Sequence, residues 1–446
     1  MFGLSASLLN SLAAFLVLMG GLSLLGRVPI HYNLMNLRVR WKTTAMTALA
    51  FTLIIALLTV MTAFVNGMVA ITEGSGQPGN VIILSEGAND ESVSNLGYGD
   101  IGDIANQPGI ERNESGPLVS RETYLVISQP IADPPPGRPQ RRFLQLRGID
   151  DPERSGRVHG IELLEGGNWF SPAGVRESSD GSTAIETVFG EGIACELARD
   201  RPPEVNATAR NRDRLEVGDA FRLDDRDWRV VGVMKSSGST FDSEVWAKRS
   251  LIGPMFGKET HSTLVARATN GAEGAQSLKK FLNESYSKAA INAQVETEYF
   301  ASLAETSTTF LYAVVFVTII LAVGGVFGIM NTMFAAISQR TADIGVLRVL
   351  GFSRTSILMS FLLESMTLAL IGGTLGCLIG ALVDGTTATS IVGSGHAGGA
   401  KLVVLKLAVD INTIAAGMLL ALTMGLLGGL LPSLNAMRLS PLKAIR

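Results

Sequence analysis

Long apolar stretches alternate with one large polar region along the chain. A helix needs roughly 20 apolar residues to cross a bilayer. Five stretches reach that length: 4–25, 44–65, 308–337, 357–383 and 411–434. The pattern predicts a membrane α-helical protein with four core transmembrane helices and one extra N-terminal helix.

The first apolar stretch differs from the others in its flanking charges. A secretory signal peptide carries positive charges before its apolar run. Here the basic residues, from Arg27 to Lys42, follow the run instead. We therefore expect a retained transmembrane helix over residues 1–26 and a cytoplasmic amphipathic helix over 27–43. A re-entrant or interfacial segment over 1–26 remains the alternative.

Residues 66–307 have the pattern of a folded domain outside the membrane. Runs rich in β-forming residues lie at 80–84, 124–128, 142–148 and 215–246, the last with the pattern of two antiparallel strands. Turn residues separate these runs. Apolar residues at helical spacing predict a helix over 272–292. The region is long enough to bury its own core, and we predict a mixed α/β domain inserted after the first core helix.

Composition and charge agree with this division. The 446 residues are 47% hydrophobic and 17% charged, whereas about a quarter of the residues in soluble proteins are charged. Most of the charged residues lie between 72 and 305. The net charge is -3 and the chain has no block rich in Lys and Arg, so nothing indicates nucleic-acid binding.

The basic residues outside the domain give the orientation in the membrane. They gather at 27–42, in the link 338–354 and in the tail 435–446. Segments rich in Lys and Arg stay on the cytoplasmic side. We therefore expect helices over 44–65, 308–337, 355–383 and 411–434, with the domain 66–307 and the loop 384–410 outside the cytoplasm.

The domain shows no catalytic or metal-binding pattern. Neither H-E-x-x-H nor G-x-S-x-G occurs, and the isolated His159, His261 and His396 are expected to be solvated or to cap helices. Cys195 and Cys377 have no nearby second cysteine and are predicted to be small buried thiols. No G-x-x-x-x-G-K-[ST] phosphate loop occurs. We expect no metal, no cofactor and no enzymatic activity of this chain.

The link between the second and third core helices predicts a short amphipathic helix over 338–350. Arg340 and Asp343 are three residues apart, which places them on one face of such a helix, opposite an apolar side that includes Ile344 and Leu347. Such a helix can dock into the groove of a partner. An interfacial anchor or a plain connection explains the pattern equally well.

The ends of this short helix also have sequence signals. Gly351 is suited to end it, and Ser353 can cap the helix that follows. Ten residues beyond Arg354, Glu364 lies within an apolar stretch. Because a charge in the bilayer is unfavourable, Glu364 is expected to face the protein interior or lie near the interface. A structural or coupling role is favoured over a proton relay.

Small residues recur every four positions in three of the core helices. They are Gly324, Gly328, Gly372, Gly376, Gly380, Gly417, Ala421, Gly425 and Gly429. This spacing lets two helices approach closely. Packing within the chain and a dimer interface both account for it.

Three segments resemble one known family. The string QRTADIGVLRVLGFSRTSI is similar to the coupling-helix region of MacB/FtsX-type ABC permeases, in which an arginine, an acidic–Ile–Gly step and an A/V-L-G turn recur. The tail LLPSLNAMRLSPLKAIR resembles the family's ending, and HYNLMNLRVRWKTTAMTALAFTLIIALLTVM resembles its first core helix with the segment before it. The resemblance extends over residues 31–446. Asp343 stands where the family has Glu, and the helix before Arg27 is additional.

The resemblance implies which residues contact an ATPase and which partners exist. It assigns the coupling helix to Arg340, Asp343, Ile344, Gly345, Leu347, Arg348 and Gly351. Two ATPase subunits carrying ATP and Mg would join a homodimer or a pseudo-symmetric heterodimer of this chain in the bacterial inner membrane. A periplasmic adaptor is a further implied partner.

The implied function is that of an ABC transporter permease subunit. ATP hydrolysis on the ATPase would drive movement of a MacB-like periplasmic domain, for export, efflux or lipoprotein release. The alternative within the same resemblance is an FtsX-like scaffold that regulates enzymes of the cell envelope. A membrane enzyme with its site in the outer domain is the third hypothesis, disfavoured by the lack of a catalytic pattern.

Overall fold

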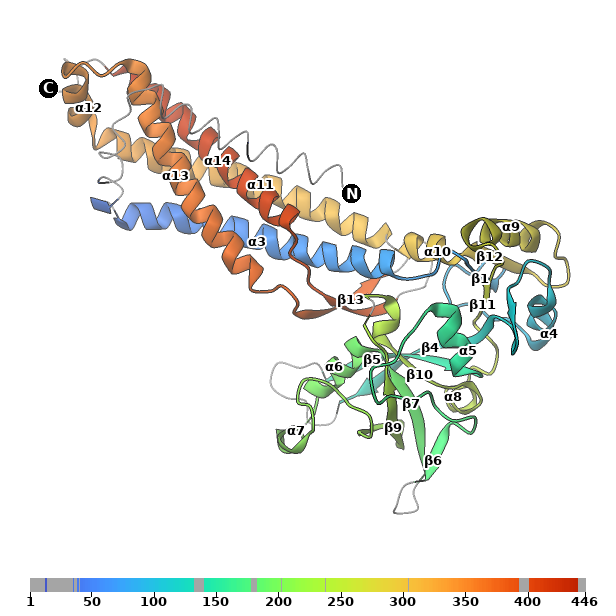
Figure 1. The fold of residues 1–446 in the computed structure, drawn as a ribbon. Helices are drawn as coiled ribbons and strands as arrows, with labels where there is room; N and C mark the ends of the chain where they lie inside the picture. The colour runs from blue at the N-terminus through green and yellow to red at the C-terminus, as the bar shows by residue number, and fades with distance from the viewer. Residues whose placement is uncertain are drawn as a thin grey trace. The chain divides into compact units, whose positions relative to one another are not determined.

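The computed structural model divides the chain into two compact units (Figure 1). It describes residues 13, 35, 38–39, 41–131, 140–177, 183–201, 203–236, 238–303, 305–392 and 401–439. The helical unit comprises residues 1–66, 310–386 and 407–446, and the sheet unit comprises 67–309 and 387–406. The expected N-terminal helix over 1–26, most of the amphipathic helix over 27–43 and the end of the tail lie outside the described residues.

Among the described residues, four long helices make up most of the helical unit. They are α3 (Trp41–Gly74), α11 (Glu305–Ser338), α13 (Arg354–Ala381) and α14 (Ile411–Arg438). All four are long and apolar enough to cross a membrane, which confirms the four core helices predicted from the sequence. Both α3 and α11 are longer than their apolar stretches. Helix α3 continues to Gly74 and α11 begins at Glu305, so one end of each helix belongs to the sheet unit.

Glycines on α13 and α14 allow these helices to pack closely. A Cβ atom on Gly376 would lie 2.8 Å from the Cβ of Ile55 in α3, and one on Gly372 would lie 2.6 Å from the carbonyl oxygen of Ala48. On α14, a Cβ on Gly425 would lie 2.7 Å from the Cβ of Ala369. Gly380, Gly417 and Gly429 face neighbouring helices in the same way. Packing within the chain therefore explains the small residues of α13 and α14.

Gly324 and Gly328 on α11 behave differently. A Cβ on either glycine would meet no atom of the described residues within 4 Å, whereas the adjacent Gly325 faces Met424 and Ile54. The prediction that Gly324 and Gly328 pack against other helices is therefore not met by the described part of this chain.

A ten-stranded sheet forms the centre of the sheet unit. Its strands follow the order β12-β1-β11-β4-β5-β10-β7-β9-β8, and β6 pairs with β7. The bounds are β1 (Asn80–Ser85), β4 (Val119–Pro130), β5 (Arg141–Ile149), β6 (Val175–Glu177), β7 (Thr183–Phe189), β8 (Ala220–Leu223), β9 (Arg226–Val233), β10 (Glu244–Lys248), β11 (Thr263–Arg267) and β12 (Ile291–Val295). Neighbouring strands are antiparallel except for the pairs β5–β10 and β7–β9.

Short helices and two hairpins complete the sheet unit. The helices are α4 (Tyr98–Gly102), η1 (Ile104–Asn106), α5 (Pro152–His159), α6 (Glu191–Arg199), α7 (Pro203–Thr208), η2 (Thr240–Ser243), α8 (Arg249–Met255), α9 (Gly271–Glu284) and α10 (Glu296–Leu303). Strands β2 (Arg112–Asn113) and β3 (Gly116–Pro117) form one hairpin, and β13 (Thr387–Val392) and β14 (Lys401–Lys406) form the other.

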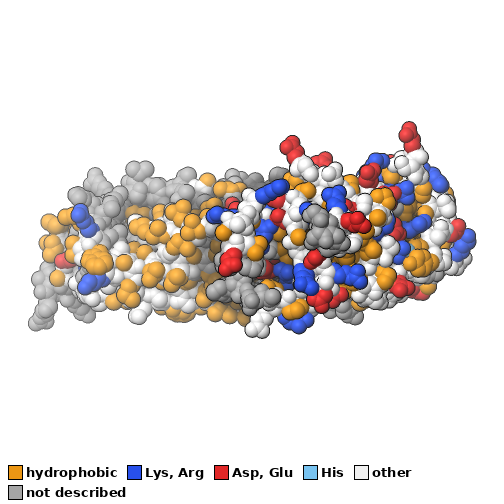
Figure 2. Space-filling model, turned by 90° about the horizontal axis from the view of Figure 1, so that it is seen from below, with side chains coloured by type: hydrophobic (Ala, Val, Ile, Leu, Met, Phe, Trp, Pro, Cys, Tyr) orange, Lys and Arg blue, Asp and Glu red, His pale blue; other side chains and the backbone are white. Residues whose placement is uncertain are grey.

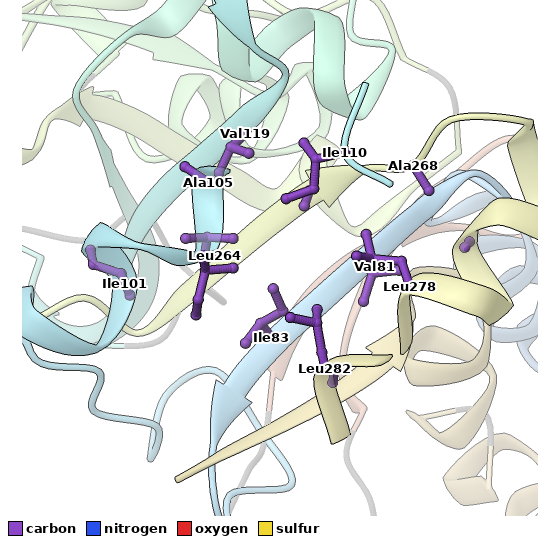
Figure 3. Close-up of a cluster of buried hydrophobic side chains, with 14 of the residues drawn as sticks. Val81, Ile83, Ile101, Ala105, Ile110, Val119, Leu264, Ala268, Leu278 and Leu282 are labelled. Carbon is purple, nitrogen blue, oxygen red and sulfur yellow. The ribbon is translucent and has the colours of Figure 1, made fainter. Parts of the chain in front are cut away.

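The sheet carries two apolar cores. In the first, Val81 and Ile83 of β1 and Leu264 of β11 pack against Leu278 and Leu282 of α9 (Figure 3). In the second, residues of β5, β7, β9 and β10 pack against α6 and α8. The charged side chains of the chain gather on this unit, whereas hydrophobic side chains dominate the helical unit on the face shown in Figure 2.

The predicted mixed α/β domain is confirmed, and the sheet unit also includes residues 387–406, but one predicted helix was wrong in extent. The helix expected over 272–292 ends at Glu284, and residues Ile291–Val295 form β12 at the edge of the sheet. Pairing with the distant β1 explains this strand, because such long-range pairing overrides local helical spacing. The predicted pair of antiparallel strands within 215–246 appears as β8 and β9.

Candidate functional site

A tight turn at the end of the helical unit carries the candidate coupling helix, α12 (Thr341–Val349). Helix α11 ends at Ser338, and α12 begins after Arg340. Gly351 has φ of 94°, a conformation that glycine adopts without a steric penalty. The Ser353 side chain then accepts a hydrogen bond from the Ser356 amide and caps α13. The predicted helix end at Gly351 and cap at Ser353 are therefore observed.

An ion pair fixes the start of α12 to α13. The Arg340 guanidinium donates to both carboxylate oxygens of Glu364, over 2.9 and 3.0 Å. The two side chains are only 3% and 5% exposed. A two-pronged pair of this kind sets both distance and orientation. Glu364 therefore faces the protein interior, as predicted, and its partner is a residue of the coupling segment.

The burial of Arg340 corrects the predicted face of α12. Arg340 and Asp343 were expected to share one face of the helix, but Arg340 is buried and Asp343 is exposed. The difference arises because Arg340 precedes the first turn of α12 and is drawn toward Glu364. Arg340 can thus position α12, whereas Asp343 remains accessible to a partner.

The rest of α12 has one buried and one exposed apolar side. Ile344 is 2% exposed and packs in the same cluster as Ile357 and Phe361 of α13. Gly345 is also buried. On the other side, three apolar residues are 52%, 67% and 70% exposed: Val346, Val349 and Leu350. We call these three residues and Asp343 the outer face of α12.

Leu347 and Arg348 complete the turn. Leu347 is half-buried and lines a small internal space with Ile344 and Phe352. The Arg348 side chain donates to the Phe352 carbonyl over 3.3 Å. A cation near the last carbonyls of a helix is favourable. Both residues therefore stabilise the turn, and neither lies on the outer face.

The sheet unit contains a buried ionic cluster that the sequence analysis did not predict. Arg147 of β5 pairs with Glu91, Glu122 and Glu244. His159 contacts Glu122 through Nε2, over 2.6 Å. All these side chains are at most 2% exposed. The cluster joins three strands of the sheet, because Glu122 lies in β4 and Glu244 in β10.

His159 reaches this cluster because both ends of α5 are fixed. The Asp151 side chain accepts from the Arg154 amide at the first turn, and Gly160 adopts φ of 68° at the last. The second ring nitrogen, Nδ1, lies 3.0 Å from Glu296, the first residue of α10. Glu296 also accepts hydrogen bonds from the Gln77 amide and from the Asn80 side chain, each over 2.8 Å.

The pKa values of this cluster favour its charged form. Burial alone would lower the pKa of His159, but the charge of Glu122 and the hydrogen bonds to Glu122 and Glu296 raise it to about 10. Burial would raise the pKa of Glu122, but the charges of Arg147 and His159 lower it to about 2. His159 is therefore a cation at neutral pH and can donate from both ring nitrogens.

The expectation that the histidines are solvated or cap helices was wrong for two of them. His159 is buried in the ionic cluster, and His261 is 2% exposed; His396 lies outside the described residues. Cys377 is buried as predicted, whereas Cys195 is half-buried. Among the described residues, no group of three His, Cys, Asp or Glu side chains is arranged to hold a metal ion. The charged strand residues Glu122 and Arg147 were the one available signal of the cluster.

Two sequence families match this chain. The family described as MacB-like periplasmic core domain matches residues 44–282, and the family described as FtsX-like permease C-terminal matches residues 315–441. The first match covers most of α3 and the sheet unit as far as α9, and the second covers most of α11 together with α12, α13 and α14. The two matches follow one another along the chain without overlap.

The chain is also similar to individual proteins. It is 27% identical over 300 residues to the macrolide export ATP-binding/permease protein MacB of Shewanella sp. strain ANA-3, covering 65% of this chain and 42% of that protein. It is 23% identical over 394 residues to the macrolide export ATP-binding/permease protein MacB of Burkholderia cenocepacia strain HI2424. This match covers 85% of this chain and 54% of that protein. The chain thus spans about half the length of these curated relatives.

Two solved structures match part of the chain, both with low TM-scores. The periplasmic region of MacB from Actinobacillus actinomycetemcomitans is 15% identical, with a TM-score of 0.33, over 52% of this chain and 94% of that one. The extracellular domain of the ABC-type transporter YknZ from Gram-positive bacteria is 14% identical, with a TM-score of 0.32, over 48% and 99%.

Proposed function

Because this chain belongs to the family of MacB/FtsX-type ABC transporter permeases, we propose that it transmits the work of a cytoplasmic ATPase to its sheet unit. The chain is a membrane protein, and the sheet unit is its extracytoplasmic domain. Helix α12 follows α11 along the chain, and its outer face is the proposed docking surface for the ATPase.

The observation that carries this proposal is the exposed apolar outer face. Val346 and Val349 lie in α12 and Leu350 follows it directly, so this surface is not part of any of the four membrane-crossing helices. An exposed apolar helix face beside a charge is suited to a hydrophobic groove on a partner. The Arg340–Glu364 pair and the buried Ile344 hold α12 against α13, so a push on α12 would be passed to a membrane helix.

The proposal extends to the composition of the complex. Two copies of the chain, or this chain and a related one, would work with two ATPase subunits that bind ATP and Mg, and the chain itself would hydrolyse no ATP. The open Gly324 and Gly328 on α11 are suited to close approach of a second copy. We place the complex in the bacterial inner membrane, where its sheet unit would act in export, efflux or lipoprotein release, with or without a periplasmic adaptor.

Reconstitution with an ABC-type ATPase from the same organism tests this proposal. We expect the full chain in nanodiscs to bind that ATPase and to change its rate of ATP hydrolysis. Val349→Asp should weaken binding at least about tenfold, or ~1.4 kcal/mol, because it places a charge in the apolar contact. The matched control is Val205→Asp, which changes a valine 53% exposed on α7 of the sheet unit.

The same measurement separates the competing hypotheses. If the folded wild-type chain does not bind the ATPase, the permease proposal is wrong and the envelope scaffold becomes the better explanation. If Val349→Asp and Val205→Asp bind equally well, the ATPase does not dock on the outer face of α12.

A further inference from the structure

Three chain segments connect the membrane helices to the sheet unit. The end of α3 leads into β1, α10 leads into α11, and the hairpin β13–β14 lies between α13 and α14. Within the sheet unit, all three contact one short turn, η2 (Thr240–Ser243). Its four residues are between 0% and 7% exposed. We call these four residues the junction turn.

The first contact comes from the end of α3. The Thr240 amide donates to the side-chain oxygen of Ser75 over 2.8 Å. The same Ser75 hydroxyl donates to the carbonyl of Ile71, in the last part of α3. Ser75 is 1% exposed. One hydroxyl group therefore ties the final turn of α3 to the start of the junction turn.

The second contact comes from the hairpin β13–β14. The Val404 amide of β14 donates to the side-chain oxygen of Ser243 over 2.8 Å. Gly192 of α6 lies beside both the junction turn and β14, because a Cβ there would be 2.9 Å from the Asp242 carbonyl oxygen and 3.4 Å from the Val404 Cβ. The hairpin is therefore held at the end of the junction turn opposite to α3.

The third contact comes from α10 and involves the ring of Phe241. This ring packs edge-on against Phe300 of α10, with centroids 6.1 Å apart, and against His159, 4.7 Å away. His159 in turn pairs with Glu296 at the start of α10. Helix α10 is thus held both by the Phe241 ring and by the buried ionic cluster.

We infer that the junction turn couples the sheet to the end of α3, to α10 and to the hairpin β13–β14. A movement of any of these three segments would then shift the sheet through the junction turn. Strand β10 follows the turn directly and lies between β5 and β7 near the centre of the sheet. Coupling between distant parts travels through such continuous hydrogen bonds and packed side chains. The inference rests on the proposed function, since it assumes that the membrane helices move when the ATPase binds nucleotide.

A pair of matched double variants tests this inference in the full chain bound to its ATPase in nanodiscs. Ser75→Ala/Ser243→Ala removes the two side-chain acceptors that tie α3 and the hairpin to the junction turn. The control, Ser94→Ala/Ser262→Ala, removes two equally buried acceptors in the same unit. Ser94 accepts from the Ser85 amide and Ser262 from the Tyr124 amide, each over 2.9 Å.

The readout is hydrogen–deuterium exchange of β7 and β10, with and without ATP and vanadate. We expect both double variants to bind the ATPase and to alter its hydrolysis rate as the wild type does. The nucleotide-dependent change in exchange should persist in the wild type and the control, and fall at least threefold in Ser75→Ala/Ser243→Ala. If that double variant does not fold, Ser243→Ala compared with Ser94→Ala makes the same comparison.

The possible failures are distinguishable. An equal nucleotide response in the junction variant and the control overturns the inference and leaves the proposed function intact. An equal loss in both variants also overturns it, because general destabilisation then explains the effect. A wild-type chain that does not bind the ATPase, or shows no nucleotide-dependent change, overturns the proposed function and the inference together.

Discussion

The guanidinium of Arg340 and the carboxylate of Glu364 form two hydrogen bonds of 2.9 and 3.0 Å, although 24 positions separate them in the chain. Both side chains are buried. Desolvating two charges offsets much of their attraction, so such a pair contributes little net stability compared with an apolar pair. Its effect here is to define where α12 lies against α13.

This view predicts that single and double substitutions behave differently. Glu364→Gln leaves the charge of Arg340 buried without its counter-ion and should lower the free energy of unfolding by about 3–5 kcal/mol. Arg340→Met/Glu364→Leu removes both charges and should recover most of that loss. Unfolding of the purified chain in mixed detergent micelles measures both. Asp343→Asn is the control, because an exposed change is usually within about 0.5 kcal/mol.

The apolar double variant should keep most of its stability and still lose part of its ATPase coupling. The apolar double variant is expected to fold but to lose part of its effect on ATP hydrolysis, because packing alone fixes α12 less specifically than a two-pronged pair. The interpretation fails if Glu364→Gln is as stable as Asp343→Asn, or if the apolar double variant is the least stable of the set.

The glycines of the membrane helices give a second prediction. Gly376→Leu should destabilise the helical unit by about 1–3 kcal/mol or more, because its side chain would collide with Ile55 and force α13 away from α3. Gly324→Leu should leave the free energy of unfolding within about 0.5 kcal/mol, since a Cβ there meets no described atom within 4 Å.

Crosslinking in nanodiscs then distinguishes the two roles of small residues. If a second copy packs on Gly324, Gly324→Leu should lower the yield of crosslinked dimer. Gly376→Leu should instead lower the stability of the single chain. Equal crosslinking by wild type and Gly324→Leu would exclude this part of α11 from the dimer interface.

Local sequence was sufficient where a single stretch of chain decides the structure. Apolar runs of membrane length predicted α3, α11, α13 and α14, and Gly351 and Ser353 marked the end of α12 and the start of α13. These features depend on neighbours within one or two turns.

The errors concern partners that are distant in the chain. Arg340 was expected to share a helix face with Asp343 because the two residues are three positions apart, and only the fold brings Arg340 to Glu364. His159 was expected to be solvated or to cap a helix because it is isolated in the sequence, outside any catalytic or metal-binding motif. Its carboxylate partners come from β4 and from the start of α10, 37 and 137 positions away.

The charge of His159 gives the last prediction, which concerns pH. Its pKa in the folded chain is about 10, above the usual value of 6.5. A raised pKa means that the folded state binds the proton more tightly than the unfolded state. The stabilisation is therefore complete below pH 6.5 and is lost as the pH rises from there through about 10.

We expect His159→Gln to lower the free energy of unfolding of the sheet unit by about 3–5 kcal/mol at pH 6.5, because it removes a buried cation from between two carboxylates. The difference from wild type should shrink toward pH 10, as followed by urea unfolding of the full chain in detergent with tryptophan fluorescence. Trp246 lies 5.9 Å from the His159 ring and reports on this region.

His261→Gln is the matched control for this experiment. His261 is also buried, but burial and the charge of Arg249 lower its pKa to about 4. It is therefore neutral from pH 6.5 to 10 in both the folded and, for the most part, the unfolded chain, and its variant should differ from wild type by a nearly constant amount. A His159→Gln difference that is equally constant across this range would mean that His159 is neutral in the folded chain, and the buried cluster would then carry Arg147 as its principal cation.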